Sequence, residues 1–396
     1  MQRIVGTIRH YDWGSPDFIA NLLGKPVTDV PNAEYWLGTH PSSPTTITDD
    51  GYNSDLRTFL KANPQLLGEK IRGKYGDELP YLVKILSAAA PLSLQAHPNE
   101  EDARAGFEKE NAEGIALDDP RRTFKDPRPK PELIVALTEF DALVGFRDPA
   151  ESYRLFTALG DIPELDSVIG PLENRRGSAA LEEVFLDALS IDEDRRWIVN
   201  EVVSAAIKHI DDPGKVGDFA RTAVLIDEHF PGDPSLIAAL LLNRRHLHPG
   251  QALHVSPGTM HAYLNGSGVE VMTSSDNVLR GGLTGKHIDA DALVRVVTFK
   301  SEPAKILMPS QIRGGVETYD HPDSTYRVWR IKPDGDAVEL PAESSARILL
   351  VTEGSLLLHS AGRQELLERG QSVFLAAEEQ VSALGDGTAF LTSVGE

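Results

Sequence analysis

The hydrophobic and polar positions of the chain change their pattern twice between its two ends. Residues 1–55 carry short apolar runs separated by Gly, Pro, Thr and Asp, and two longer apolar stretches follow over residues 81–97 and 131–147. Apolar runs bounded by turn residues are typical of strands, and the longer stretches predict buried ones. We therefore expect a β structure over the first 148 residues.

From about residue 149 to 243 the apolar residues recur at helical spacing. One face of a predicted helix carries four of them at intervals of four: Ile198, Val202, Ala206 and Ile210. Asp192 is suited to cap this helix, and Asp233-Pro234 is suited to begin another near Ile237. After residue 246 the strand-and-turn pattern returns and continues to the end. This order predicts a helical domain inserted into a mainly β protein.

The last part of the chain contains a weak internal repeat. The string LHPGQALHVSPGTMHAYL (247–264) aligns with LERGQSVFLAAEEQVSAL (367–384), and both place Gly-Gln at a turn before an apolar run. The first copy, with a Pro-Gly turn before His261, resembles the second motif of cupins, which are small β-barrels that often hold a metal. The second copy has Val381 in place of that histidine. The alternative is that two β-hairpins simply share a Gly turn.

A real repeat implies two cupin-like β-barrels of the jelly-roll type. The expected domains are a catalytic barrel from residues 1–148 and 244–310, a helical domain over 149–243, and a degenerate C-terminal barrel over 311–396. The N-terminal barrel would then hold the only working site, because the C-terminal one has lost the histidine.

Composition and charge narrow the function classes. A chain of 396 residues is long enough for two or three domains. Its net charge of −21 makes nucleic acid an unsuitable partner, while an anionic small molecule would need a local Lys and Arg cluster. The chain has no cysteine, so any metal must be held by nitrogen and oxygen ligands. The sequence shows neither an apolar signal segment nor a membrane span, so we expect a cytoplasmic protein.

Candidate metal ligands lie on the predicted strands. Gln95 and His97 are two residues apart, so a strand would point both to one face. Glu132 opens the next apolar stretch, and His261 follows the Pro-Gly turn. Two imidazoles, a carboxylate and an amide oxygen suit Zn²⁺, with Mn²⁺, Fe²⁺ or Co²⁺ as alternatives. Three other histidines are rival ligands by spacing: His246, His248 and His254. His246 and His248 precede the turn at Pro249-Gly250, which places them at a loop edge and makes them weaker candidates.

Longer strings around these residues resemble type I phosphomannose isomerases. The strings are YDWG (11–14), AEYWLGTHPSSPT (33–45), LPYLVKILSAAAPLSLQAHPN (79–99), KDPRPKPELIVALTEFDAL (125–143) and PGTMHAYLNGSGVEVMTSSDNVLRGGLTGKHID (257–289). They keep the family's order and together span about 280 residues, from 11 to 289. The region from about residue 311 carries little of the resemblance.

The resemblance implies an enzyme that interconverts mannose 6-phosphate and fructose 6-phosphate through an enediol, within carbohydrate metabolism and GDP-mannose biosynthesis. It implies one zinc ion per chain on Gln95, His97, Glu132 and His261. It makes Arg280 the active-site arginine and places five further residues in the pocket: Ser93, Lys84, Lys130, Glu270 and Lys286. Among these, Lys84 and Lys286 are candidate phosphate anchors, and Glu270 and Lys130 are rival candidates for the proton carrier.

The chain departs from the family pattern at two places. Arg128-Pro129 replaces an Asn-His pair, and Thr284-Gly285-Lys286 replaces Thr-Pro-Lys, a change that should loosen the loop. Several alternatives stay open. In the first alternative, Lys84 and Glu270 point outward into solvent. In the others, Lys286 is an ordinary surface lysine and Arg280 serves only in a salt bridge. Two other functions also stay open, a non-catalytic sugar-phosphate sensor and another metal-dependent cupin enzyme, and so does the oligomeric state.

Overall fold

The two long apolar stretches form buried strands of an 11-stranded sheet in the computed structural model, which describes residues 1–48, 54–175, 177–302 and 304–395. The strands of this sheet are β2 (Thr7–Arg9), β3 (Glu34–Leu37), β6 (Tyr81–Ala88), β7 (Leu94–Ala96), β8 (Glu132–Ala136), β9 (Phe140–Phe146), β10 (Leu242–Leu247), β11 (Ala252–Val255), β12 (His261–Thr273), β13 (Leu279–Gly282) and β14 (Ile306–Leu307). The protein is therefore built mainly of β-sheets, with helices added.

The long strand β12 organises this sheet. Its second half pairs with β6 and β8, and its first residues pair with β7 and β9. Successive side chains point to opposite faces. Val269 and Val271 accordingly pack in an apolar cluster that also contains residues of the C-terminal region, while Glu270 lies on the other face. That other face lines the interior of the sheet structure, so charged residues on it are buried and not solvated.

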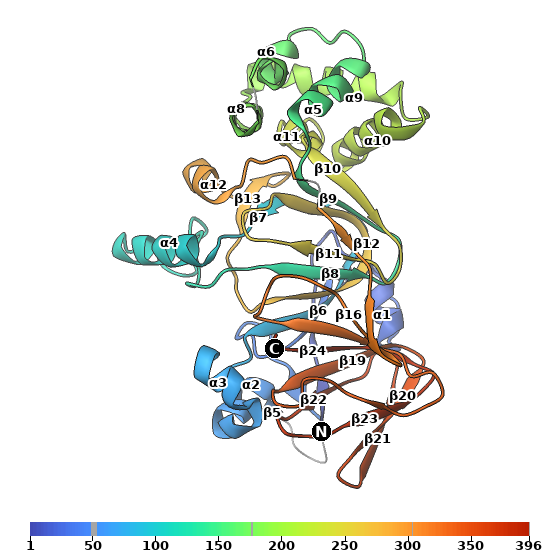
Figure 1. Ribbon diagram of the computed structural model, residues 1–396. Coiled ribbons are helices and arrows are strands. Elements are labelled where there is room, and N and C mark those ends of the chain that lie inside the picture. The colour runs from blue at the N-terminus through green and yellow to red at the C-terminus, as the bar shows by residue number, and fades with distance from the viewer. Residues whose placement is uncertain (49–53, 176, 303, 396) are drawn as a thin grey trace.

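Every described helix between residues 149 and 240 falls between β9 and β10, and together they cover one end of the molecule (Figure 1). They are α5 (Pro149–Ala158), α6 (Asp166–Ile169), α7 (Pro171–Asn174), α8 (Ser178–Leu189), η2 (Glu193–Arg195), α9 (Trp197–Ile207), α10 (Gly214–His229) and α11 (Ser235–Leu240). Helical spacing thus predicted this segment correctly.

Two details of the helical segment differ from expectation. Asp192 caps the short turn η2, where its side chain accepts from the Arg195 amide, and α9 begins after that turn. Ile198 and Ala206 are buried in α9, but Ile210 lies beyond the helix end. No helix of the described ranges is long and apolar enough to span a membrane.

A second, 9-stranded sheet occupies the other end of the molecule (Figure 1). It contains β1 (Gln2–Val5), β4 (Thr46–Ile47), β5 (Ser54–Asp55), β15 (Ser310–Arg313), β16 (Val316–Thr318), β17 (Arg327–Ile331), β19 (Arg347–Glu353), β22 (Ser372–Leu375) and β24 (Thr388–Ser393). A 4-stranded sheet joins β18 (Val338–Glu339), β20 (Ser355–Ser360), β21 (Arg363–Glu368) and β23 (Ser382–Gly385).

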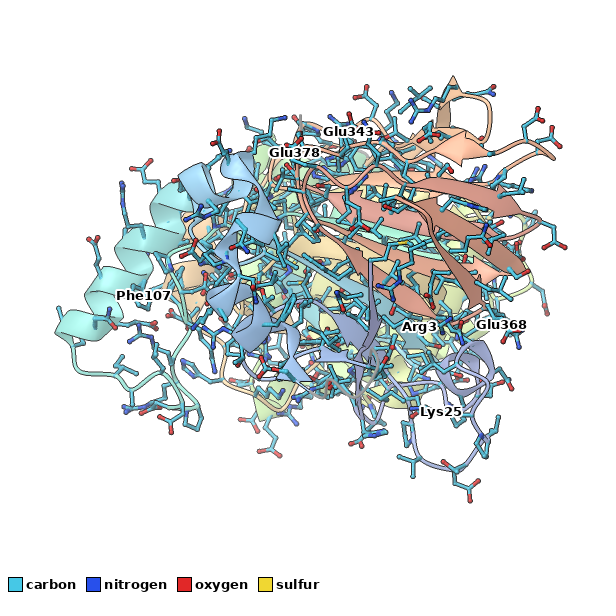
Figure 2. All side chains as sticks on the ribbon, turned by 90° about the horizontal axis from the view of Figure 1, so that it is seen from below. Arg3, Lys25, Phe107, Glu343, Glu368 and Glu378 are labelled. Carbon is cyan, nitrogen blue, oxygen red and sulfur yellow. The ribbon has the colours of Figure 1, made fainter. Side chains whose placement is uncertain are left out.

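The first strand of the chain belongs to this C-terminal sheet. Strand β1 pairs with β22, and Arg3 bonds to Glu365 and to the carbonyl of Leu366 in β21 (Figure 2, where Arg3 and the last residue of β21, Glu368, are labelled). The predicted domain boundary at residue 311 therefore does not separate the two sheets. Strands β1, β4 and β5 precede that boundary in sequence but belong to the C-terminal sheet. Sequence alone did not show this, since strand pairing is not visible in an apolar pattern.

Short helices flank the two sheets. They are α1 (Phe18–Leu22), α2 (Leu56–Ala62), η1 (Pro64–Leu67), α3 (Glu69–Tyr75), α4 (Glu100–Ala112) and α12 (Ala290–Val296). The composition of residues 1–55 favours strands and turns, and the structure adds the short helix α1 within them.

The internal repeat corresponds to matching strands. Its apolar run is β11 (Ala252–Val255) in the first copy and β22 (Ser372–Leu375) in the second. The next strand begins at His261 in the first copy and beside Val381 in the second. Val381 is buried in a cluster of apolar side chains that fills this region. The second copy thus packs hydrocarbon at the position where the first presents an imidazole.

Candidate metal centre and substrate pocket

Three of the four proposed metal ligands meet inside the 11-stranded sheet. Nε2 of His97 lies 3.1 Å from Oε1 of Glu132, and Nε2 of His261 lies 3.4 Å from Oε2 of the same carboxylate. All three side chains are buried. Ligands of a tetrahedral zinc site, with bonds of about 2.0–2.1 Å, lie roughly 3.3 Å apart. The spacing of these atoms therefore fits a shared divalent ion.

The hydrogen bonds of the two histidines leave Nε2, the nitrogen that faces Glu132, free to bind a metal. Nδ1 of His97 is 2.8 Å from the carbonyl of Asn277, and Nδ1 of His261 is 3.0 Å from the carbonyl of Thr259. A carbonyl can only accept, so both rings carry the proton on Nδ1. Each Nε2 is then a buried lone pair with no hydrogen-bond partner among the described residues. Such orphaned acceptors are costly unless a metal uses them.

The Pro-Gly turn brings the two histidines together. The amide of Gly258 donates to the carbonyl of His97 at 2.8 Å. Gly258 has φ +83°, and a Cβ on it would come within 2.7 Å of the Thr298 hydroxyl. Glycine is thus required both by the left-handed conformation and by the close packing. The sequence signal at residues 257–261 reflects a turn that fixes the ligand positions.

Gln95 occupies the middle of a row across three strands. It is paired with His261 in β12 on one side and with Arg280 in β13 on the other. Residues directly opposite in antiparallel strands point to the same face. Gln95 is half-buried, and Ser93, also half-buried, lies two residues before it in the preceding loop. Strand geometry therefore places the amide beside the His261 ligand and joins it to the arginine.

Lys84 and Glu270 form a buried ion pair across β6 and β12. Nζ of Lys84 lies 3.1 Å from Glu270 and 3.4 Å from Glu34, and its ammonium sits 4.9 Å from the ring centre of Trp36. Burial alone would lower the pKa of Lys84, but Glu34, Glu270 and Glu132 together raise it. Burial raises the pKa of Glu270, with Lys84 opposing. The outward, solvated alternatives for Lys84 and Glu270 are thus wrong.

Lys130 completes the charge pattern around the metal ligands. Its ammonium lies 3.0 Å from Oε1 of Glu132, and it is buried. Burial would raise the pKa of Glu132, but the ammonium group of Lys130 holds it well below its usual range. Burial and the charge of Lys130 lower the pKa of His97 to about 4. The histidine is therefore neutral and the glutamate ionised near neutral pH, which are the forms that bind a metal.

Positive side chains gather where the site opens outward. Arg280 is half-buried in β13, and burial lowers its pKa. Lys286 is exposed, and partial burial together with the charges of Arg280 and Lys125 lowers its pKa. A group whose protonated form is disfavoured by neighbouring cations marks a region of positive potential. This is the local Lys and Arg cluster that an anionic ligand of an acidic protein requires.

Asn277 is a site residue that the sequence reasoning did not single out. It is fully buried, and its side chain accepts from the amide of Lys125 at 2.7 Å and donates to the carbonyls of Asp126 and Arg128 at 2.7 and 2.9 Å. Its own carbonyl orients His97. Asn277 therefore ties the loop before Glu132 to a metal ligand. It lies inside the SDNVLR string, but only the fold reveals its contacts.

The rival histidines lie elsewhere. His246 and His248 are exposed beside Glu139, and His254 stacks on His321 with 5.3 Å between ring centres. Neither group includes a residue of the buried triad. Their position before the Pro249-Gly250 turn had already made His246 and His248 the weaker candidates, and the structure places them outside the triad.

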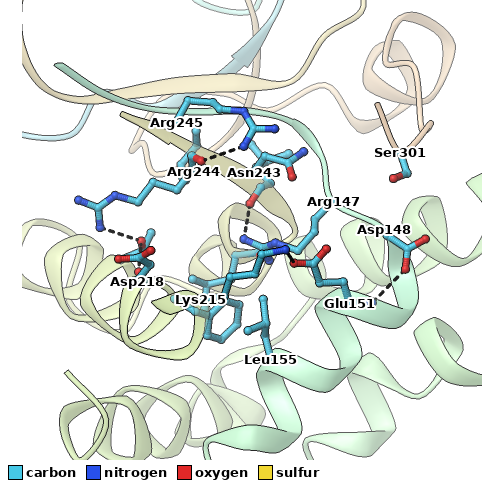
Figure 3. A pocket seen from close by; sticks show the side chains of 15 residues that line it. Arg147, Asp148, Glu151, Leu155, Lys215, Asp218, Asn243, Arg244, Arg245 and Ser301 are labelled. Carbon is cyan, nitrogen blue, oxygen red and sulfur yellow. Dashed lines mark hydrogen bonds and ion pairs between the residues drawn. The ribbon is translucent and has the colours of Figure 1, made fainter. Parts of the chain in front are cut away.

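A separate cavity of about 430 Å³ lies between β9, β10 and helices α5 and α10 (Figure 3). Its arginine Arg147 donates to the carbonyls of Leu240 and Leu242 at 2.7 Å each, and Lys215 pairs with Glu151 at 2.5 Å. Arg147 thus ties the end of β9 to the junction of α11 and β10, and Lys215 ties α10 to α5. None of the proposed site residues lines this cavity, so the metal triad marks the candidate site.

Comparisons with known proteins identify the family of the chain. Residues 1–149 match the family model "Phosphomannose isomerase type I, catalytic domain". Mannose-6-phosphate isomerase of Salmonella typhimurium is 35% identical over 98% of both chains, and its human counterpart is 31% identical over 95% of this chain and 93% of its own.

Solved structures give the same result. A zinc-bound mannose 6-phosphate isomerase superposes with a TM-score of 0.89 at 32% identity, covering 100% of this chain and 99% of the other. An alanine variant of phosphomannose isomerase from Salmonella typhimurium gives a TM-score of 0.90 over 100% of both chains. Sequence identity and fold agree over the full length, so the chain belongs to the type I phosphomannose isomerase family.

Proposed function

We propose that this protein is a metal-dependent aldose–ketose isomerase that interconverts mannose 6-phosphate and fructose 6-phosphate through an enediol. The observation that carries the proposal is the pair of buried, unpartnered Nε2 atoms of His97 and His261, both facing the carboxylate of Glu132. Gln95 supplies the fourth ligand. One zinc ion per chain suits this mixed nitrogen and oxygen set, with other divalent metals as alternatives.

The charges around the triad prepare it for an anionic substrate. The carboxylates of Glu34, Glu132 and Glu270 outnumber the two buried ammonium groups by one. A bound divalent ion reverses the sign of the site and, as a Lewis acid, polarises the sugar oxygens. Arg280 stays protonated and stabilises the negative oxygens of the enediolate.

The phosphate binds at the outer cationic cluster. Lys286 anchors it from the loop after β13, and Ser93 contributes a hydroxyl from the loop before β7. The sequence also made Lys84 a candidate anchor, but its ammonium is already neutralised by Glu34 and Glu270. We therefore assign Lys84 to holding Glu270 within the pocket.

Glu270 carries the proton between C1 and C2 of the open-chain sugar. Its raised pKa brings it closer to the working pH, where a general base is most effective. The rival, Lys130, lies 3.0 Å from Glu132, and this contact suits it to hold the metal-binding carboxylate in place. Lys130 therefore acts on the ligand, and Glu270 acts on the substrate.

The finer architecture follows the same proposal. Residues 1–148 and 244–310 form a catalytic cupin-like barrel, 149–243 a helical domain, and 311–396 a degenerate cupin-like barrel, completed by β1, β4 and β5 from the N-terminal region. The cytoplasmic location and the sugar-phosphate partner stay predictions.

A coupled assay on mannose 6-phosphate tests the function. Activity should be lost on chelation and restored by Zn²⁺, and metal content should fall with activity in His97→Ala and His261→Ala. Full turnover of the thoroughly stripped protein would exclude the metal role. Sugar phosphate that binds without turnover in the metal-loaded protein would instead favour a non-catalytic sensor.

A further inference from the structure

A second group of metal-type ligands lies on the outside of the β9–β10 pair. Nε2 of His246 is 2.6 Å from Oε2 of Glu139, and Nδ1 of His248 is 2.8 Å from the same oxygen. All three side chains are exposed, from 46% for His246 to 65% for His248. None of them belongs to the buried triad, and the isomerase function leaves them unused.

Strand register explains why these residues meet. Phe140 is paired with Leu247 and Asp141 with His246 in the antiparallel ladder, which places Glu139 opposite His248. Phe140 and Leu247 are fully buried, so alternation sends their neighbours outward on the other face. Two imidazoles at i and i+2 on one strand therefore face two carboxylates at i and i+2 on the other.

The fourth member of the group orients a ligand. Oδ1 of Asp141 lies 3.2 Å from Nδ1 of His246, and Asp141 is itself paired with Arg244 at 3.3 Å. A carboxylate that accepts the Nδ1 proton of a histidine leaves Nε2 as the lone-pair atom, which is the arrangement found behind metal-binding imidazoles. The same division of roles occurs at His97 and His261 in the buried triad.

We propose that Glu139, His246 and His248 form a second, surface site for a borderline divalent cation such as Zn²⁺. Two nitrogens and one carboxylate oxygen are the ligand set that such ions prefer, and the open side leaves room for water. The present contacts are hydrogen-bond lengths, so the ion replaces a shared proton and moves the ligands apart by roughly half an ångström. Exposed side chains allow that adjustment.

The position of the site gives it a structural consequence. His246 and Glu139 are 107 residues apart in sequence, and the whole helical segment lies between β9 and β10. A metal ion bound here would cross-link β9 and β10 near the point where the chain leaves the sheet for the helical segment and returns from it. Because the ion binds the folded pair better than the unfolded chain, it stabilises the fold by an amount that grows with the logarithm of its free concentration once the site is occupied.

Zn²⁺ titration of the zinc-loaded enzyme by calorimetry tests this site. We expect one further equivalent, weaker than the first, and a melting temperature that rises with free Zn²⁺. The double variant His246→Ala/His248→Ala should lose the further equivalent and the rise while keeping its first zinc and its turnover. The matched control is His209→Ala/His229→Ala, because His209 forms a histidine–carboxylate pair with Asp212 at 2.7 Å without a second imidazole.

Glu139→Gln provides a second variant on the opposite strand, and it should weaken the further equivalent at least tenfold without loss of the first. Binding of no further equivalent by the wild-type enzyme at millimolar Zn²⁺ would overturn the proposal, as would equal binding by the double variant. Should the buried site prove not to bind metal, the stripped protein would still bind one equivalent that depends on His246 and His248, so the two proposals fail separately.

Discussion

The ammonium group of Lys84 lies 3.1 Å from the carboxylate of Glu270, directly across the ladder of β6 and β12. Both groups are buried on the inner face of the sheet, and burial raises the pKa of Glu270. This pairing holds a carboxylate of raised pKa at a fixed point in the pocket, next to Glu132.

Glu270→Gln should therefore lower kcat by roughly 10²- to 10⁴-fold, the usual loss when a general base is removed. Zinc content and the KM for mannose 6-phosphate should change little, because the amide keeps the shape of the side chain. Steady-state kinetics and metal analysis measure both. Glu110→Gln is the matched control, since Glu110 is also buried and pairs with Arg122 at 3.0 Å away from the triad. Turnover within threefold of wild type would move the base elsewhere.

Asn277→Ala should weaken zinc binding about 10- to 100-fold, as is typical when a residue that orients a ligand is changed. The carbonyl that binds His97 remains, but the side chain no longer ties the backbone of Lys125, Asp126 and Arg128. Competition with a chelator measures the affinity, and excess Zn²⁺ should restore turnover. Unchanged affinity would show that the loop holds its position unaided.

The sequence predicts features that depend on neighbouring residues better than features that depend on distant segments of the chain. Spacing along the chain correctly predicted the helices from residue 149 onward, because periodicity is local. The sequence left open whether Glu270 lies in a pocket or points outward into solvent, because the burial of a strand face depends on what packs against it. Only the pairing of strands shows enclosure.

Non-local pairing accounts for the other differences. Strand β1 joins the C-terminal sheet through a register with β22, residues 2–4 facing residues 372–374. Asn277 acts through backbone groups at residues 125–128, about 150 positions away in sequence. His246 and His248 also carry imidazoles that can bind a metal. The register of β9 and β10 places them on the outer face of the sheet, away from the buried triad.

Arg280→Ala and Lys286→Ala should separate two electrostatic roles. Loss of Arg280 should lower kcat about 10²- to 10³-fold, because its charge opposes a negative charge that develops in the transition state. Loss of Lys286 should raise the KM for mannose 6-phosphate roughly tenfold and leave kcat near wild type, since the phosphate is bound equally in both states. Lys300→Ala, another exposed lysine, is the control.

Mannose without its phosphate gives the contrasting measurement. The Arg280 effect should persist on this poor substrate, while the Lys286 effect should vanish with the phosphate. A Lys286 effect of equal size on both sugars would show that the loop contacts the sugar ring instead.

The stability of the protein should fall as the pH drops through the weakly acidic range because of His321. This side chain is buried and stacked on His254, and burial, with smaller contributions from His254 and Arg327, lowers its pKa to about 3 from the ordinary 6.5. The unfolded chain therefore takes up the proton first, and each unit of pH below 6.5 favours unfolding. The stabilisation is complete above about pH 6.5 and is lost progressively toward pH 3.

Between pH 6.5 and 4.5 this single group should remove about 2 kcal/mol from the free energy of unfolding. Urea unfolding of wild type and His321→Phe measures the difference. The phenyl ring keeps the stack on His254 and Tyr326 but binds no proton, so the variant should have the flatter pH profile over this range. His229→Phe changes an exposed histidine and should leave the wild-type slope intact. Parallel slopes for wild type and His321→Phe would mean that the buried imidazole is hydrated well enough to keep its ordinary pKa.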